Sequence, residues 1–574
     1  MRSLGRILYG KRASADAQAP APPPADARAQ AMQRLQIGLA GLATMVLMIA
    51  LANVIMDQAN QTQATSVPQA AATIAAEPTK APQIDPLAEA GVVPDMPTQP
   101  TPAPPLLEWA KGASWSIRDS FQGVQVFGST GSGKSSGSLA AICRAMLQAG
   151  YGGMFFTVKR EDRATYEKYV RDAGRTDDLL VFSPDSPLRY NFIASEMTQT
   201  RDAVGLAENL TALVMTVAEL GDRNRKSGSG GSENAEYFRQ ATLRLCRHAM
   251  LVLVLSEQQV TVPNLHRLVI AAPRSREEAL SESWQRDSFF FQCLRSAGSA
   301  KMNDSQRADF DLAIVFFMEE WAGLNSRTRS TVESTLTSAT DALSRGAVRD
   351  MVSAPNPNFS PESLYNGSVV IVDFPVLVYR DIGQLIQVVL KYCTQRCHGR
   401  RDINRNARPT FIVCDECHLL IVDADQAFQT TARSSHTAVV YATQSISTYL
   451  EAFGSQSEAR VHSLLGNLQT QIFHQQTDIK TINYVQELVG RSRQLFMNSN
   501  ATRGGDWLAP LWGESSGGSA GFSESFEFEL QAGELNGLAK GGPPHWFTEV
   551  IVYQGGRRFP NDRTWCRTAI PQRR

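Results

Sequence analysis

The chain has 574 residues, too many for a single hydrophobic core, so we expect at least two domains. Its 56 Lys and Arg residues balance its 56 Asp and Glu residues, so the formal net charge is zero. This balance excludes a chain that binds nucleic acid through a global basic field, and any contact with DNA would need a local surface such as the lumen of a ring.

The first part of the chain is predicted to be a membrane anchor followed by a flexible stalk. Residues 35–56 contain no charge and lie between Arg34 and Asp57, and about 20 apolar residues are enough for a helix to cross a bilayer. A buried soluble helix fits less well because both flanks are polar. A cleaved signal peptide fits less well because the apolar stretch starts late and is long. Residues 1–34 are predicted to be a disordered tail and residues 57–105, which are rich in Pro and Ala, a semi-extended linker.

A phosphate-binding loop is predicted where the globular part begins. Residues 128–135 match the pattern G-x-x-x-x-G-K-[ST], between an apolar stretch at 124–127 and a helical pattern, which is the context that the motif requires. The glycines let backbone N–H groups face phosphates at a helix N-terminus. We predict that nucleotide binds to Gly128, Ser129, Thr130, Gly131, Ser132, Gly133, Lys134, Ser135 and Ser136. Lys134 is also predicted to be catalytic, because it would reach the β- and γ-phosphates.

A second motif, about 280 residues later, supplies two acids. The apolar stretch 410–414 ends in Asp415 and Glu416. We predict that Ser135 and Asp415 bind Mg²⁺ and that Glu416 polarises the attacking water. The two motifs together therefore predict a site that binds ATP with Mg²⁺ and hydrolyses it. Cysteine and histidine pairs at 397–398 and 417–418 resemble a zinc spacing, but the strand position of Cys414 favours buried thiols.

Short apolar stretches predict a doubly wound α/β sheet, because helical patterns separate several of them. The predicted strands are 124–127, 153–158, 179–182, 369–374, 410–414, 437–441 and 469–474, with closing strands at 522–530 and 547–552. Between about residues 196 and 355 the strands largely stop and helical periodicity dominates. We therefore predict a nucleotide-binding domain of residues 106–195 and 356–574, with an all-helical domain inserted at 196–355. Flexible loops are predicted at 227–232 and 496–520 from their Gly and Ser content.

Two further residues are predicted to be catalytic. Gln444 follows the strand 437–441, which should adjoin the phosphate loop, and its amide can bond both the γ-phosphate and the attacking water. Arg433 lies 11 residues earlier, at the other end of that strand, where it cannot easily reach its own γ-phosphate but could reach the site of a neighbouring subunit as an arginine finger. The simpler interpretations are a polar strand end for Gln444 and a solvated or salt-bridged arginine for Arg433.

These features resemble the TraG/TraD family of type IV secretion coupling proteins, which belongs with the FtsK and HerA translocases among RecA-like hexameric DNA pumps. The similarity covers about residues 120–555, and it rests on 128–135, 415–416, 442–445, 465–467, 477–481 and 489–490. The resemblance implies an α/β, RecA-like P-loop NTPase fold with an inserted all-α domain and an N-terminal transmembrane anchor. It matches Arg433 to the in-trans arginine and Gln444 to the sensor of such ATPases.

The resemblance also implies a function and a location. Such a protein is a motor ATPase of the bacterial inner membrane, forms a homo-hexamer, and delivers DNA or a relaxase–DNA complex, through the ring lumen, to the channel components of a type IV secretion system. The alternatives are an FtsK/HerA-like DNA translocase outside a secretion system and a nucleotide-switched substrate receptor or scaffold. Glu416 and Gln444 argue against the last, because a pure binder needs no water-activating acid.

This chain departs from the family pattern in three places. It has one predicted transmembrane helix where the family usually has two, and the turn at residues 157–160 keeps only Lys159 of an Asp-Pro-Lys-Gly-like sequence. Its last four residues, 571–574, include two arginines, where family members can carry a long acidic tail. These differences concern docking and cargo more than ATP hydrolysis.

The charges around the predicted anchor conflict with a cytoplasmic ATPase. Six basic and two acidic residues give residues 1–34 a net charge of +4, whereas one basic and five acidic residues give residues 57–105 a net charge of −4. The positive-inside rule then places the N-terminus in the cytoplasm and the phosphate loop outside, away from ATP. We expect either that the ATPase part lies in the cytoplasm in spite of this rule or that the helix does not fully span the membrane.

Overall fold

The structure is a computed structural model that describes residues 105–199, 233–256, 258–354, 356–454, 457–502 and 517–572, with short stretches between 205 and 216. The predicted tail, transmembrane helix and linker up to residue 104 lie outside the described residues, as do the loop at 227–232 and residues 503–516 of the second predicted loop. Within the described ranges, no helix has the length and hydropathy needed to cross a bilayer.

A nine-stranded mixed sheet, in the order β13-β12-β9-β3-β8-β7-β4-β6-β5, forms the centre of this part of the chain. The seven strands from β9 to β5 run parallel, whereas β12 and β13 extend the sheet antiparallel to their neighbours. The strands are β3 (Val124–Phe127), β4 (Gly152–Phe156), β5 (Leu179–Phe182), β6 (Val369–Val372), β7 (Thr410–Cys414), β8 (Thr437–Thr443), β9 (Thr470–Phe473), β12 (Phe547–Gln554) and β13 (Trp565–Pro571).

Helices cover both faces of the sheet, so its parallel strands are buried on both sides. Successive side chains of β4 alternate between two cores: Phe155 packs in one and its neighbours Met154 and Phe156 in the other. The first core includes α4 (Ala140–Gln148) and α5 (Asp162–Asp172), and the second includes α16 (Val376–Gly399), α17 (Asp423–Thr431), α18 (Ile446–Phe453), α19 (Glu458–Gly466) and α20 (Ile479–Val489). The prediction of an α/β fold is confirmed.

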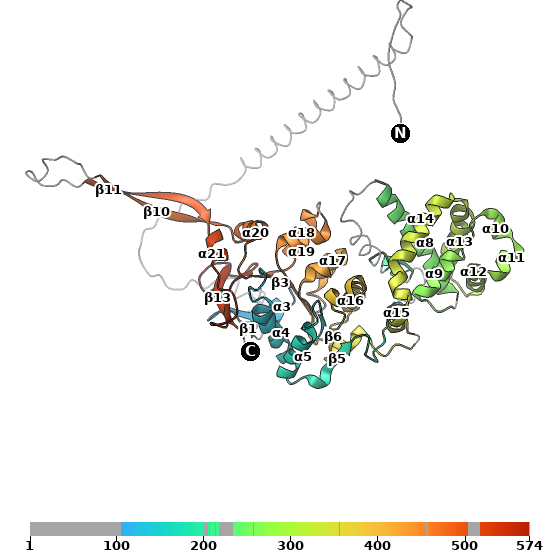
Figure 1. The fold of residues 1–574 in the computed structure, drawn as a ribbon, viewed down its shortest axis with the longest axis horizontal. Coiled ribbons are helices and arrows are strands. Elements are labelled where there is room, and N and C mark those ends of the chain that lie inside the picture. The colour runs from blue at the N-terminus through green and yellow to red at the C-terminus, as the bar shows by residue number, and fades with distance from the viewer. Residues whose placement is uncertain are drawn as a thin grey trace, which may run out of the picture. The chain divides into compact units, whose positions relative to one another are not determined.

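A helical insertion separates β5 from β6, as predicted, and its described part contains no strand. Figure 1 shows these helices packed against one another. The side chain of Glu196 ties the insertion to α16, because it pairs with Arg396 at 3.3 Å and with Arg400 at 2.5 Å. The helices are α6 (Phe192–Gln199), α8 (Glu233–Leu255), α9 (Val262–Ile270), α10 (Arg276–Leu280), α11 (Glu282–Asp287), α12 (Phe289–Ser299), α13 (Asp304–Val315), α14 (Ser326–Thr340) and α15 (Gly346–Val352).

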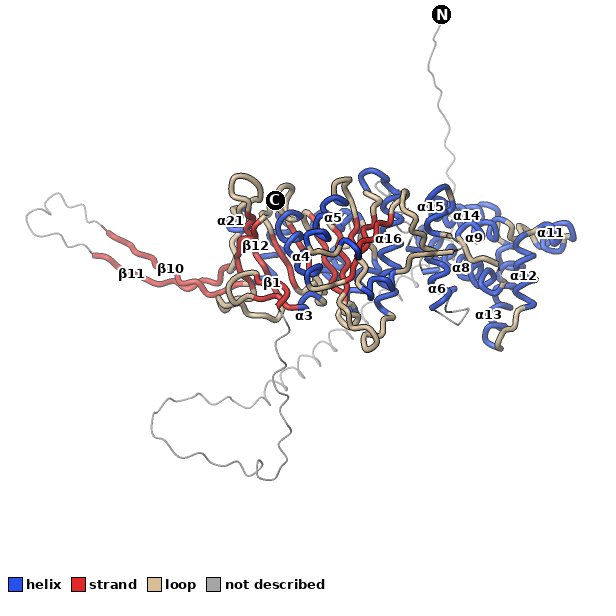
Figure 2. The backbone as a smooth tube through the Cα atoms, turned by 90° about the horizontal axis from the view of Figure 1, so that it is seen from below, coloured by secondary structure: helices blue, strands red, loops and turns tan. Residues whose placement is uncertain are grey.

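The C-terminal part differs from the predicted strands. The expected closing strand 522–530 does not join the central sheet: β11 (Gly517–Phe528) pairs with β10 (Arg491–Thr502) in a separate two-stranded ribbon, drawn in Figure 2. Residues 496–502 and 517–520, expected to be loop from their Gly, Ser and Asn content, are therefore strand. The sheet instead closes with β12 and with β13, which was not predicted. The remaining strands and α-helices of the described residues are β1 (Pro105–Glu108), β2 (Ser114–Ser116), α3 (Ile117–Ser120) and α21 (Ala532–Asn536).

Candidate active site

The predicted phosphate loop connects β3 to a short π-helical turn, Ser135–Leu139, that leads into α4. Its glycines are needed for two different reasons. Gly133 has a φ of +89°, in the left-handed region that favours glycine. A Cβ on Gly128 would lie 2.4 Å from Ser132 Oγ and 2.7 Å from His474 Cβ, so the chain can pass there only without a side chain.

Neighbouring strands hold the back of this loop. His474, which directly follows β9, lies 3.1 Å through Nδ1 from the Ser132 carbonyl and 2.8 Å through Nε2 from Ser138 Oγ. Thr548 of β12 donates its hydroxyl to the same carbonyl at 2.8 Å. A carbonyl can only accept, so His474 donates from Nδ1 and accepts from Ser138 at Nε2. His474 was not predicted as a site residue, because nothing in the local sequence shows that β9 lies beside β3.

Burial makes this histidine a source of acid sensitivity. Burial lowers the pKa of His474 to about 3, and also that of His398, in α16, to about 3. An unfolded histidine titrates near 6.5, so between pH 6.5 and pH 3 the unfolded chain binds more protons than the folded chain. The stability that these neutral imidazoles contribute is therefore complete above pH 6.5 and is lost as the pH falls below it.

We expect the free energy of unfolding to fall by about 2 kcal/mol per buried histidine when the pH is lowered from 7.5 to 5. Thermal unfolding of the wild-type protein and of His474→Asn, followed at both pH values, measures this. The variant should lose less stability on acidification than the wild-type protein. His462→Asn, which changes a half-exposed histidine of α19, is the matched control. An equal loss in His474→Asn and wild type would contradict the assignment.

The four residues that the two motifs contribute lie together at the carboxyl ends of β3 and β7. Ser135 Oγ donates to Asp415 Oδ2 at 2.5 Å, and Lys134 Nζ lies 3.7 Å from Glu416 Oε1. Asp415 and Glu416 are both buried. Glu416 has a φ of +46°, an unfavourable conformation for a residue with a side chain, and such strain is found at functional sites. A hydroxyl and a carboxylate oxygen that converge in this way are the hard ligands that Mg²⁺ prefers.

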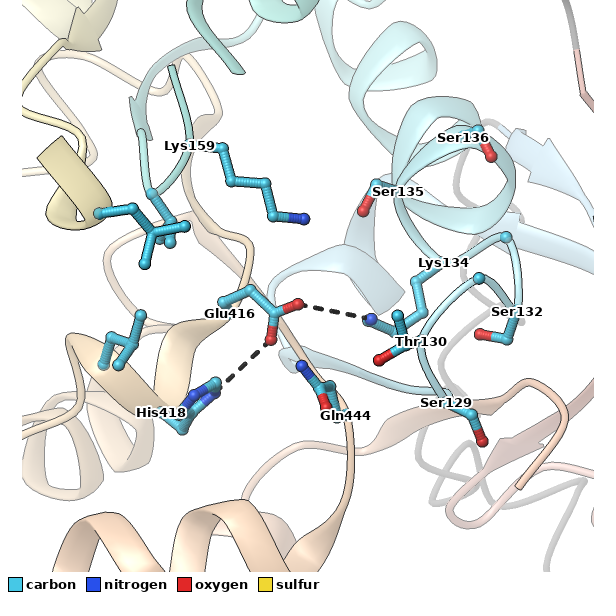
Figure 3. A pocket seen from close by; sticks show the side chains of 15 residues that line it. Ser129, Thr130, Ser132, Lys134, Ser135, Ser136, Lys159, Glu416, His418 and Gln444 are labelled. Carbon is cyan, nitrogen blue, oxygen red and sulfur yellow. Dashed lines mark ion pairs between the residues drawn. The ribbon is translucent and has the colours of Figure 1, made fainter. Parts of the chain in front are cut away.

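Lys134, Ser135 and Glu416 border a cavity of about 570 Å³, whose interior is shown in Figure 3, whereas Asp415 contacts Ser135 and is not part of the lining. It is lined by Ser129, Thr130, Gly131, Ser132, Gly133, Lys134, Ser135, Ser136, Val158, Lys159, Leu377, Glu416, His418, Leu419 and Gln444. Every predicted nucleotide-binding residue except Gly128 therefore lines the cavity, and the N–H of Gly128 donates to the Thr443 carbonyl at 3.3 Å.

Gln444 and Arg433 lie at opposite ends of β8. Gln444 directly follows the strand and lines the cavity. Its backbone carbonyl oxygen accepts a hydrogen bond from Gln476 Nε2 at 2.7 Å. Because β8 pairs with both β3 and β7, this end of the strand lies between the two motifs. Arg433 precedes the strand and is exposed, so the structure does not bring it together with the other predicted site residues.

Two cavity residues with polar side chains, Lys159 and His418, were not assigned a role from the sequence. The Lys159 side chain extends into the cavity from the turn after β4 (Figure 3), and Asp162 holds that turn by accepting from the backbone N–H groups of Val158 and Lys159 at 2.8 and 2.7 Å. His418 follows Glu416 by two residues and faces it. The position of Lys159 directly after an expected strand was the available signal, but the pairing of β4 with β7 was needed to place it.

Comparisons with known protein families and curated proteins give one match. A family profile described as the TraM recognition site of TraD and TraG matches residues 409–527. A search of curated proteins found no match.

The fold is that of solved structures of the coupling protein TrwB. An unbound form of this bacterial conjugative coupling protein is 14% identical, covers 83% of this chain and 90% of its own, and has a TM-score of 0.52. The plasmid coupling protein TrwB in complex with ADP and Mg²⁺ is 14% identical, with coverages of 81% and 89% and a TM-score of 0.51. Its complex with the ATP analogue ADPNP is 14% identical, with coverages of 82% and 88% and a TM-score of 0.50. The family profile and the shared fold together confirm that this chain resembles the TraG/TraD family of coupling proteins.

Proposed function

We propose that the chain is a motor ATPase that couples DNA or a nucleoprotein substrate to a type IV secretion channel. The observation that carries this proposal is that Lys134, Ser135, Glu416 and Gln444 line one cavity, with Asp415 bonded to Ser135 beside it. A site that only bound nucleotide would need the phosphate loop but not a buried carboxylate aimed at the same space. The TrwB structures with ADP and Mg²⁺ and with an ATP analogue support nucleotide binding by this fold.

Each residue has a role that follows from its position. The N–H groups of residues 129–136 and the Lys134 ammonium bind the phosphates, and Ser135 Oγ and Asp415 would hold Mg²⁺, which would supply positive charge that neutralises the phosphates. Glu416 accepts the proton of the attacking water. Gln444 orients that water against the γ-phosphate, and Lys159 adds a second positive charge to the lining of the cavity.

The domain organisation that we propose follows from the same features. Residues 106–195 and 356–574 form a RecA-like nucleotide-binding domain, and residues 196–355 form the inserted helical domain. Residues 35–56 anchor the chain in the inner membrane through the linker at 57–105. The matched profile, named for TraM recognition, supports a partner of the TraM type in addition to DNA and channel components.

We further propose that the active form is a ring, a homo-hexamer, with nucleotide bound where subunits meet. The start of α16 forms an exposed apolar segment beside the cavity, and Leu377 belongs to both. A neighbouring subunit would cover this segment and close the site. Its exposed apolar residues are Leu377 (66%), Val378 (54%), Tyr379 (40%) and Ile382 (42%).

Transfer of a DNA substrate to recipient cells tests this function. A Lys134→Ala chain should be produced and located as the wild-type chain is, but transfer should stop, because the motor cannot bind the phosphates of its fuel. Wild-type transfer with Lys134→Ala would contradict the proposal. A transfer defect that appears only together with a chromosome-partitioning defect would favour an FtsK/HerA-like translocase.

The proposed topology has its own test. We expect a reporter active only in the cytoplasm to be active at the C-terminus, because ATP is available only there. A cysteine placed near residue 20 reports whether the tail is reachable from the periplasm, which separates a full span from partial insertion. Labelling of the C-terminus from the periplasm would contradict the ATPase proposal itself, since the site would have no substrate.

A further inference from the structure

His418 occupies a position between two parts of the nucleotide site. It lies in the short turn Cys417–Leu419 after Glu416, and its imidazole lines the cavity. Its Nδ1 is 2.9 Å from Thr443 Oγ1, at the end of β8, and 3.7 Å from Glu416 Oε2. One ring nitrogen thus faces both the acid proposed to activate water and Thr443, the residue before Gln444; the dashed line in Figure 3 marks the contact with the acid.

The neighbouring hydroxyls determine which way these hydrogen bonds run. Thr448 Oγ1 donates to the Ser445 carbonyl at 2.6 Å, so it has no proton left for Thr443 Oγ1, 2.9 Å away. Thr443 therefore donates to Thr448 and accepts from His418, which requires the proton of the imidazole to be on Nδ1. Burial lowers the pKa of His418, which keeps the ring neutral at pH 7 and leaves a single Nδ1–H to donate.

The carboxylate oxygen of Glu416 that faces this donor, Oε2, lacks a hydrogen bond within the described part of the chain. This oxygen is buried. The 3.7 Å that separates it from His418 Nδ1 is too long for a hydrogen bond, but a modest rotation of the carboxylate would close it. On the other side, Lys134 Nζ holds Oε1 at 3.7 Å.

Thr443 also connects this group to the phosphate loop. Its carbonyl accepts from the N–H of Gly128 at 3.3 Å, and the next residue in the chain is Gln444. His418 is therefore attached, through one threonine, to the first residue of the loop and to the residue proposed to orient the attacking water.

We propose that His418 is a positioning residue for Glu416. When bound nucleotide draws Lys134 to its phosphates, the Nδ1–H of His418 passes from Thr443 Oγ1 to Glu416 Oε2 and holds the carboxylate with Oε1 toward the attacking water. Only hydrogen bonds are exchanged, and Glu416 remains the proton acceptor. The inference rests on the proposed ATPase function.

Steady-state hydrolysis by His418→Ala and His418→Asn tests the proposal on the full-length chain. His418→Ala should lower kcat for MgATP by about 10- to 100-fold, the effect of one hydrogen bond to a charged group, with KM unchanged within about twofold. Asn can place its amide N–H near the position of Nδ1, so His418→Asn should retain most of kcat. His462→Ala, at a half-exposed histidine outside the cavity, is the matched control and should equal wild type.

A double-mutant cycle separates positioning from a structural role. In the Glu416→Gln background, single-turnover rates with and without His418→Ala should differ by less than about twofold, because His418 acts through the acid that is already missing. Equal losses in both backgrounds, or a wild-type kcat in His418→Ala, would overturn the proposal.

Structures of the full chain with and without an ATP analogue and Mg²⁺ give a readout independent of turnover. The distance from His418 Nδ1 to Glu416 Oε2 should shorten from 3.7 Å to about 2.9 Å when the analogue is bound. A distance that stays at 3.7 Å would overturn the role of His418 even if the enzyme is active. A wild-type protein that never hydrolyses ATP would instead overturn the proposed function, and the same distance would still decide whether His418 moves.

Discussion

Replacement of Glu416 by Gln is expected to lower kcat for ATP hydrolysis by about 100- to 10,000-fold while nucleotide affinity stays within a few-fold of wild type. The amide has nearly the shape of the carboxylate but cannot accept the proton of the attacking water. Phosphate binding depends on the loop and on Lys134, which this change leaves in place. Hydrolysis is measured by phosphate release, and affinity by titration with a fluorescent ATP analogue.

Two variants delimit this result. Lys134→Ala should lose both hydrolysis and tight binding, because it removes the positive charge from the phosphates. Glu458→Gln makes the same chemical change at an exposed glutamate at the start of α19 and should leave both quantities unchanged. If Glu416→Gln hydrolyses ATP at the wild-type rate, Glu416 does not activate water.

Loss of Arg433 is expected to have the second large effect. If Arg433 reaches the γ-phosphate bound to a neighbouring subunit, Arg433→Ala should lower kcat by about 1,000- to 100,000-fold, the range known for arginine fingers. Arg433 is exposed and precedes β8, whereas Gln444 follows the strand, so Arg433 lies at the opposite end of β8 from the cavity of its own subunit. Arg405→Ala, at an arginine that is 89% exposed and pairs with Asp402, is the matched control.

A mixing experiment shows whether the arginine acts between subunits. Arg433→Ala and Lys134→Ala proteins, each inactive alone, should recover part of the activity when they assemble together, because some interfaces then pair an intact Lys134 with an intact Arg433. Mixed oligomers that are shown to form but remain inactive would make Arg433 a structural residue.

The parts of the site that could be predicted are those whose chemistry is local in the sequence. A glycine-rich loop between a strand and a helix needs only neighbouring residues to become an anion site, so the sequence alone is enough to identify residues 128–136. Asp415 and Glu416 can be identified in the same way, since an apolar strand that ends in acids places them at a sheet edge. Gln444 required one step more, the expectation that its strand adjoins the loop, and β8 does pair with β3.

The residues that the sequence analysis missed depend on pairing between distant segments. His474 reaches the phosphate loop because β9 pairs with β3, about 340 residues away, and Lys159 reaches the cavity because β4 lies beside β7. His418 was part of a pattern first considered for zinc, and its role follows only from its distances to Thr443 and Glu416.

The β10–β11 ribbon was missed for a different reason. Residues 496–502 of β10 and 517–520 of β11 are rich in Gly, Ser and Asn, which disfavour strands when they are considered one by one. The two strands nevertheless pair with each other over 12 residues. Strand propensity depends on cross-strand neighbours, which a single sequence does not show. For the same reason β13, which pairs with β12, was not predicted.

The most direct test of the central claim is the rate of phosphate release by the purified full-length chain with MgATP, with and without DNA, beside Lys134→Ala. We predict hydrolysis that requires Mg²⁺, rises when DNA is added and is absent in Lys134→Ala. A wild-type chain that binds MgATP but releases no phosphate in the presence of DNA, or releases it no faster than Lys134→Ala, would contradict the account.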